Sequence, residues 1–316
     1  MSAEHGDAAA RAARAHEPVA AIDLGTNTAL LLVARGRADG SLETLEETCL
    51  TPRLGAGLAA TGSLDAAASE RAIEALRAFA RTIARFEIPR ARVRAVGTAC
   101  LRRARDGRAF AARAASETGL QLEILSEEEE ARLGEVAIES AGAGPDALVV
   151  DVGGGSTEIA CRALGLRRSI PIGAVVLTET WLAPGVPDEA RWANLRAAAA
   201  TEARAFPADA GVGRPVWAIG GTAVNLGACA AGLARFDPRA VEGVQVPAAR
   251  AGELATALAL RSRADRLAFP IEAERADILP AGLATLAAVL ERLGAAHVRV
   301  SGFGLRHGLA REALGS

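Results

Sequence analysis

The chain has 316 residues, a formal net charge of −2 and aromatic side chains at only 3% of positions. This length is enough for two domains with complete hydrophobic cores. The slightly negative charge argues against a protein that holds nucleic acid on a basic face. All 36 basic residues are arginines. The absence of lysine excludes P-loop NTPases and Schiff-base enzymes, because both classes need a lysine at the reacting group.

The cysteines and histidines do not form a metal-site pattern. The four cysteines are widely spaced, which favours reduced thiols in a cytoplasmic protein over a disulfide framework. Residues 1–17 lack the apolar segment of a signal peptide and are predicted to form a disordered tail. No apolar run approaches the roughly 18 residues of a membrane span, so we expect no membrane partner.

The first strand of the chain ends in an acid and a glycine turn. Val19 to Ile22 is a short apolar run followed by Asp23. Small or polar residues come next, namely Gly25, Thr26, Asn27 and Thr28. A turn of this kind can bring backbone N–H groups and hydroxyls to a phosphate, because glycine has no Cβ to block the approach. Further strands are predicted at 29–34 and, after a hairpin signal at Asp39-Gly40, at 42–48.

A helix and a strand with arginines at its end follow. Apolar residues recur every three or four positions from a capping Ser63 or Asp65 to about Phe86, which predicts a helix. The predicted strand at 93–96 leads into Arg102, Arg103 and Arg105. A guanidinium fork matches the oxygens of a phosphate. Most of these arginines fit a solvated helix end, and we expect one of them to bind an anion.

An acidic run, Ser126 to Glu130, opens the next predicted helix. Ser126 and Glu129 match a capping box, and acids in a first turn favour the helix dipole. At about 100° per residue, Glu128, Arg132, Glu135 and Glu139 share one polar face. Glu130 lies on the opposite face, among small and apolar residues. An inward carboxylate needs a partner or a function, so Glu130 is a candidate general base for water.

The stretch from Ala147 to Glu158 repeats the first motif at the scale of a domain. An apolar strand ends in Asp151 and continues with Gly153, Gly154, Gly155, Ser156, Thr157 and Glu158. A tight turn with a solvated acid would also fit these residues alone. The match to 20–28 instead predicts two related domains that face each other across a ligand-binding cleft. Asp151 needs a divalent cation to meet a phosphate without repulsion.

A third glycine turn follows a predicted strand at 215–219. Gly220, Gly221 and Thr222 start a helix there, and the first N–H groups of a helix can hold an anion. A strand with a glycine is predicted at 169–176 and a helix at 188–206. Further helices are expected at 247–264 and 275–293, a strand at 297–300, and a last helix at 305–314.

The chain resembles the Ppx/GppA family, the exopolyphosphatases and guanosine pentaphosphate phosphatases of the actin-like ATPase superfamily. The resemblance runs from about Val19 to the C-terminus through IDLGTNT, GTACLRR, SEEEEARL, VVDVGGGSTEI, SIPIGAVVLTE, AIGGTAVN and VSGFGLRHGL. It implies an α/β fold of two actin-like (ribonuclease H-like) domains with the active site between them. We expect the first domain at 18–128 plus 299–316 and the second at 129–298.

The resemblance also implies roles for single residues. Glu130 matches the catalytic base and Arg102 the phosphate-binding arginine. Asp23 and Asp151 match the acids of the two phosphate loops, with Asp151 and Glu158 expected to hold Mg²⁺ or Mn²⁺. The phosphate-binding residues are then Asp23, Gly25, Thr26, Asn27, Thr28, Gly153, Gly154, Gly155, Ser156, Thr157, Gly220, Gly221 and Thr222.

The expected activity is metal-assisted release of terminal phosphate from inorganic polyphosphate, or from guanosine pentaphosphate (pppGpp). A homodimer is one assembly that the resemblance allows. Two alternatives stay open at this point. One is a sugar- or acetate-kinase-like ATPase of the same superfamily. The other is a non-catalytic sensor that binds polyphosphate or pppGpp. This alternative stays open because Ala29 stands near a position where the family often has Arg or His, and His307 stands where the family usually has Glu.

Overall fold

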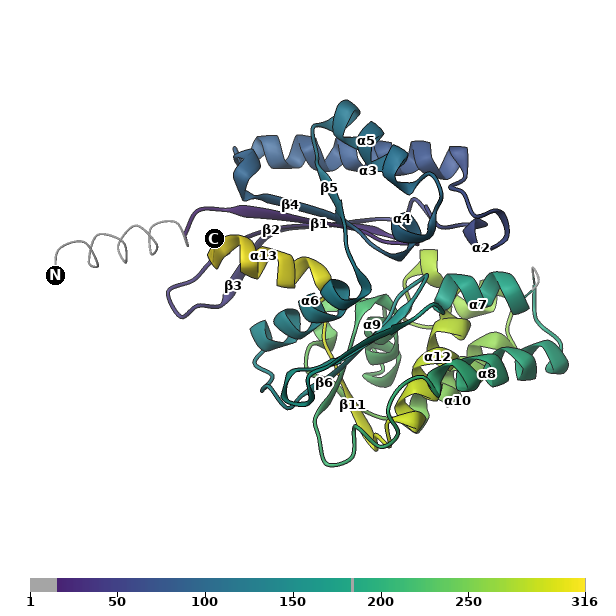
Figure 1. Cartoon of the computed structure of the whole chain (residues 1–316). Helices are drawn as coiled ribbons and strands as arrows, with labels where there is room; N and C mark the ends of the chain where they lie inside the picture. The colour runs from purple at the N-terminus through teal and green to yellow at the C-terminus, as the bar shows by residue number, and fades with distance from the viewer. Residues whose placement is uncertain (1–15, 183–184, 316) are drawn as a thin grey trace.

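The computed structural model describes residues 16–182 and 185–315 (Figure 1). The tail predicted at 1–17 therefore lies almost wholly outside the described residues. The chain forms two β-sheets with helices on their faces, so the predicted α/β class is confirmed.

The first sheet has the strand order β3-β2-β1-β4-β5. Strand β1 pairs antiparallel with β2 and parallel with β4. The outer strands β3 and β5 add to β2 and β4, antiparallel and parallel respectively. The strands are β1 (Val19–Leu24), β2 (Ala29–Gly36), β3 (Leu42–Leu50), β4 (Val93–Gly97) and β5 (Leu122–Ile124).

The second sheet repeats this topology. Read from its far edge, its order is β8-β7-β6-β9-β11, with β10 added beyond β11. Strand β6 pairs antiparallel with β7 and parallel with β9, as β1 does with β2 and β4. The strands are β6 (Leu148–Val152), β7 (Thr157–Cys161), β8 (Leu166–Ile170), β9 (Val216–Ile219), β10 (Gln245–Pro247) and β11 (His297–Val300). The repeat predicted from two short glycine motifs thus extends to five strands.

Helices cover both faces of each sheet. The first domain contains α2 (Leu58–Thr61), α3 (Ala66–Arg85), α4 (Ala99–Arg103) and α5 (Gly107–Thr118). The second contains α7 (Ala174–Trp181), α8 (Glu189–Ala203), α9 (Gly220–Ala230), α10 (Ala249–Ala259), α11 (Arg263–Arg266) and α12 (Leu279–Arg292). In the part of the chain that the structure describes, no helix combines the length and the apolar character needed to cross a membrane.

Two further helices, α6 (Glu127–Ser140) and α13 (Leu305–Gly315), exchange domains. Helix α6 follows the last strand of the first sheet, yet its Ile138 packs on Val149 and Trp217 of the second. Helix α13 follows β11, the last strand of the second sheet in chain order, yet Leu309 packs on the first sheet. The two helices lie side by side between the sheets (Figure 1). The domain boundaries predicted at 128/129 and 298/299 fall inside α6 and β11, and they stay a prediction.

One predicted strand is corrected by the structure. The run 169–176 was expected to be extended throughout, but β8 ends at Ile170 and helix α7 begins at Ala174. The backbone N–H groups of Ala174 and Val175 donate to the carbonyls of Gly153 and Gly154. A short apolar run fits a strand or a buried helix equally well. The glycine loop thus decides the outcome, because it supplies acceptors for the first turn of α7.

Candidate active site

The two glycine turns meet in one cleft between the domains. The cleft has a cavity volume of about 90 Å³ and is open to solvent. Fourteen of the residues singled out in the sequence line it, namely Asp23, Gly25, Thr26, Asn27, Thr28, Glu130, Asp151, Gly153, Gly154, Gly155, Ser156, Glu158, Gly220 and Gly221. Residues from four separate parts of the sequence therefore share one site.

The turns are built alike and touch each other. The Gly25 N–H donates to the Thr28 carbonyl at 2.9 Å, and the Gly153 N–H donates to the Ser156 carbonyl at 3.0 Å. A Cβ placed on Gly155 would lie 2.6 Å from the Oγ1 of Thr26. Contacts that short do not occur in folded proteins, so position 155 has room only for glycine while the loops stay in place.

Two buried polar atoms of residues that line the cleft have no hydrogen-bond partner. They are the Nδ2 of Asn27 and the Oδ1 of Asp23, and both residues line the cleft. An unmet buried donor and an unmet buried acceptor each cost about 1–3 kcal/mol. A ligand that accepts from Asn27 would offset one cost, and a cation or proton at Asp23 would offset the other.

The acids of the cleft hold their protons tightly. The pKa of Asp23 is raised to about 7, mainly by burial and further by the charges of Glu130 and Asp151. Burial also raises the pKa of Asp151 to about 6, while the charges of Arg275 and Arg306 act in the opposite direction. The pKa of Glu158 lies well above its usual value through burial and through the charges of Glu130 and Asp151. Bringing these carboxylates together favours a counter-cation.

Glu130 is held by an arginine. The Nη1 of Arg102 donates to the Oε2 of Glu130 at 2.9 Å and to the Leu125 carbonyl at 2.9 Å. Burial raises the pKa of Glu130 to about 7 against the opposing effect of this guanidinium. Arg102 does not line the cleft. Its expected role in binding phosphate stays a prediction, and its contact here is with the candidate base.

The helical phase placed Glu130 on the inner side of α6, and the structure agrees. Its side chain is 13% exposed. The same wheel placed Glu135 on a polar face, which is wrong. Glu135 is buried and accepts from Arg167 of β8 at 2.8 Å. Helix α6 lies between two domains and has no fully solvated face, so a wheel alone could not separate these positions.

Two predicted phosphate-binding hydroxyls are used inside the fold. Thr157 donates to the Ile172 carbonyl at 2.8 Å, and Thr222 donates to the Val152 carbonyl at 3.0 Å. Neither side chain is among those that line the cleft. The structure therefore does not bring Thr157 or Thr222 to the place where the other loop residues gather.

Sequence reasoning missed Arg275, which lies at the end of a short 3₁₀ turn, η4 (Ala273–Arg275). Its side chain lines the cleft, pairs with Glu272 at 2.5 Å and donates to the Oγ1 of Thr28 at 3.4 Å. A Cβ on Gly221 would lie 2.1 Å from its guanidinium carbon, so the second glycine of the third turn makes room for it. No strand end or glycine turn stands next to Arg275 in the sequence, so no local signal marked it.

His307 is a packing residue of the last helix. It is buried, its Nδ1 accepts from the Gly304 N–H at 3.1 Å, and its ring lies 4.4 Å from that of Phe303. Burial lowers the pKa of this imidazole well below its usual value. It is therefore neutral and does not line the cleft.

The donor set fits a cation that is shared with a substrate. Within residues 16–182 and 185–315, no three His, Cys, Asp or Glu side chains come together as a ready-made metal site. Mg²⁺ often binds through one or two carboxylates, with phosphate oxygens and water completing its shell. Asp151 and Glu158 line the cleft, and the unmet Oδ1 of Asp23 adds a third acceptor there.

A second cavity adjoins the first. It has a volume of about 270 Å³ and shares Leu30, Gly220, Gly221 and Arg275 with the cleft. Val224, Phe236 and Pro238 make part of its wall apolar, and Arg239, Arg306, Glu47 and Glu272 supply charges. The site thus joins a polar cleft rich in glycine to a roomier cavity with an apolar wall.

Comparison with known proteins supports this geometry. The model of the Ppx/GppA phosphatase family matches residues 32–316. The guanosine-5'-triphosphate,3'-diphosphate pyrophosphatase of Aeromonas salmonicida is 33% identical over 305 residues, which cover 94% of this chain and 59% of that protein. The chain thus spans about three fifths of the length of the curated relatives it matches.

Solved structures are similar over nearly the whole chain. The Ppx/GppA family member from Aquifex aeolicus has 29% sequence identity and a TM-score of 0.75, covering 94% of this chain and 98% of that one. An exopolyphosphatase from Cytophaga hutchinsonii has 22% identity and a TM-score of 0.81, with the same coverage. The second likeness concerns the fold alone. Together with the repeated topology, these matches confirm the predicted fold of two actin-like domains with a cleft between them.

Proposed function

Because the chain belongs to the Ppx/GppA phosphatase family, we propose that it hydrolyses the terminal phosphoanhydride bond of polyphosphate or pppGpp. One observation carries this proposal. A carboxylate held by an arginine, Glu130, lines the same cleft as two glycine turns from different domains. The turns suit a phosphate chain, and the carboxylate suits a water molecule beside it.

Glu130 acts as the general base. Its pKa of about 7 leaves an ionised fraction at neutral pH that can accept a proton from water. The water oxygen attacks the terminal phosphorus, the bond from that phosphorus to the bridging oxygen breaks, and orthophosphate leaves together with the shortened chain. Arg102 positions the carboxylate through its 2.9 Å contact.

Positive charge and N–H donors stabilise the phosphoryl group. The backbone of 153–156, the unmet amide of Asn27 and the guanidinium of Arg275 all border the cleft. Phosphatases of this family generally depend on a divalent cation. Mg²⁺ or Mn²⁺ would be held by Asp151 and Glu158 with phosphate oxygens, and it would supply charge at the transferred group. Donors aimed in advance at developing charge are the largest contribution in such sites.

The adjoining cavity favours a nucleotide among the candidate substrates. A phosphate chain alone would leave the apolar surface of Val224 and Phe236 unused. A purine nucleoside attached to the chain could bury that surface. The name of the Aeromonas salmonicida relative supports the same choice. We therefore place pppGpp ahead of polyphosphate. A cytoplasmic location and a homodimer remain parts of the proposal that rest on the sequence.

The test is phosphate release from long polyphosphate, short polyphosphate and pppGpp, each with Mg²⁺ and with Mn²⁺. The variant Glu130→Gln keeps the size of the side chain and removes the base. We expect its kcat to fall by roughly 10²–10⁴-fold, the usual range for a general base, with substrate binding retained. Turnover near that of the unmodified protein would remove Glu130 from this role.

Two other outcomes would replace the proposal. A strict need for ATP and an acceptor would identify a kinase-like ATPase. Tight binding of pppGpp without release of phosphate under either metal would identify a sensor.

A further inference from the structure

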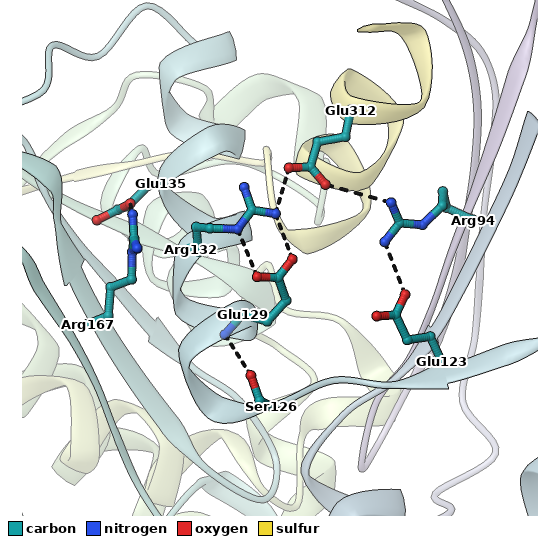
Figure 2. A network of polar contacts seen from close by, with 8 residues as sticks. All are labelled: Arg94, Glu123, Ser126, Glu129, Arg132, Glu135, Arg167 and Glu312. Carbon is teal, nitrogen blue, oxygen red and sulfur yellow. Dashed lines mark hydrogen bonds and ion pairs between the residues drawn. The ribbon is translucent and has the colours of Figure 1, made fainter. Parts of the chain in front are cut away.

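A chain of ion pairs links the helix that carries Glu130 to the C-terminal helix (Figure 2). Glu130 stands in the first turn of α6, four residues after the capping Ser126. In the same turn, Glu129 accepts two hydrogen bonds from Arg132, at 2.8 and 2.7 Å. Arg132 in turn pairs with Glu312 of α13 at 2.6 Å. The carboxylate of the candidate base is thus two residues from an arginine anchored on another element.

The same carboxylate of Glu312 reaches the first sheet. Its Oε2 lies 3.8 Å from the Nη1 of Arg94 on β4, and Arg94 donates to Glu123 of β5 at 3.1 Å. Strand β4 leads directly into α4, the helix that carries Arg102. Glu312 therefore contacts both the helix of Glu130 and the strand that precedes its arginine partner.

The two helices also touch along their backbones. A Cβ on Gly308 of α13 would lie 2.4 Å from the carbonyl oxygen of Leu133 on α6. Leu133 and Leu309 share one hydrophobic cluster. Two residues after Leu133 on α6, Glu135 pairs with Arg167 of the second sheet. The helix is thus fixed on both domains, and Glu130 lies two and five residues N-terminal to these two ion pairs.

We propose that Glu312 is a positioning residue, which holds the first turn of α6 through Arg132 so that Glu130 meets Arg102 and faces the cleft. This inference rests on the proposed function of Glu130. Small displacements of a reacting group matter, since a shift of about 1 Å can cost 100-fold in rate. The stability of the fold depends much less on the contact. Arg132 and Glu312 are 28% and 27% exposed, and partly solvated pairs contribute about 0–1 kcal/mol.

The experiment compares Glu312→Gln, Glu130→Gln and the double variant in the phosphate-release assay. For Glu312→Gln we expect a kcat about 5–20-fold lower, a KM within about twofold, and a melting temperature within about 3 °C of the unmodified protein. In the Glu130→Gln background the same change should add no further loss, because its effect passes through Glu130. Arg132→Gln removes the contact from the other side and should match Glu312→Gln, and the pair together should do no more than either alone.

Glu253→Gln is the matched control. It removes a 2.8 Å pair with Arg250 on α10, neither residue lines the cleft, and the kcat should not change. An unchanged kcat in both Glu312→Gln and Arg132→Gln would overturn the inference, as would a loss that multiplies in the Glu130→Gln background. If Glu130→Gln itself retains full turnover, the proposed base fails and this inference falls with it. If Glu130→Gln loses turnover but the Glu312 and Arg132 variants keep an unchanged kcat, the proposed function stands and this inference fails.

Discussion

The two strand-turn units of the cleft have the same backbone and offer different chemistry. The turn after β1 presents side chains, because Thr26, Asn27 and Thr28 all border the cleft. The turn after β6 presents Gly154, Gly155 and Ser156 at the equivalent positions, so two of the three side chains are missing there. Thr26 fits against the bare backbone of Gly154 and Gly155. The comparison teaches that one glycine turn of a duplicated site can supply side-chain donors only if the facing turn has glycine where those side chains pack.

A side chain added between the two glycine turns should have the largest effect on activity. In Gly155→Ala, the new Cβ would lie 2.6 Å from the Oγ1 of Thr26 and 3.3 Å from the Cβ of Ala99. We expect the loops to separate and the kcat/KM for phosphate release to fall by about 100-fold or more, since the phosphate donors are displaced. Steady-state kinetics and a thermal melt, which should change by only a few degrees, measure the two effects separately.

A second change sharpens this test. Thr26→Ala removes the hydroxyl that the new methyl group would meet, so Gly155→Ala combined with Thr26→Ala should recover part of the lost activity. Gly252→Ala on α10 is the control, because its new Cβ would make an ordinary van der Waals contact, 3.6 Å from the Cβ of Ala287. A Gly155→Ala protein as active as the unmodified one would show that activity does not need close contact between the two glycine turns.

Asp23, the acid before the first glycine turn, should affect the pH dependence of the free energy of unfolding. The pKa of Asp23 is raised from 3.8 to about 7, so the folded state binds this proton more tightly than the unfolded chain does. Its ionisation therefore lowers stability as the pH rises from about 4 to about 7, and no more beyond that. Asp23→Asn should remove this loss. At about 1.4 kcal/mol per pKa unit, and allowing for water in the cleft, the gain at pH 8 is on the order of 1–4 kcal/mol.

Denaturant unfolding in EDTA at pH 4 and at pH 8 measures this gain. We expect Asp23→Asn and the unmodified protein to be nearly equal at pH 4 and to differ at pH 8. A difference of the same size at both pH values would mean that the substitution acts through packing and not through charge.

The smallest effect is expected at Thr157, which the sequence analysis placed among the phosphate-binding residues of the second glycine turn. Thr157→Val keeps the shape of the side chain and removes its hydrogen bond to the Ile172 carbonyl. Stability should fall by about 1–2 kcal/mol, the cost of a lost bond and an unmet carbonyl, while the KM for substrate stays unchanged. A raised KM with unchanged stability would return Thr157 to the phosphate site.

Much of the site could be predicted because it lies at strand ends. Asp23 and Asp151 each follow an apolar run, and the glycines after them mark turns with local signatures. Glu130 followed from helical phase, since its neighbours on α6 are small or apolar. The failures have a common cause. Three side chains are positioned by partners distant in the sequence. Glu135 pairs with Arg167, Thr157 with the Ile172 carbonyl, and Arg275 with Thr28. Periodicity reports one element and contains no information about what packs against it.

The exchange of α6 and α13 has a consequence for how the chain is made. The first sheet is complete once β5 is formed, but one of its faces, with Val19 and Leu32, is covered by Leu305 and Leu309. During synthesis, Leu305 and Leu309 cannot cover that apolar face until helix α13 has left the ribosome. Helix α13 then closes a domain whose first strand begins at Val19, so we expect residues 19–124 to resist proteolysis only after α13 has packed on them.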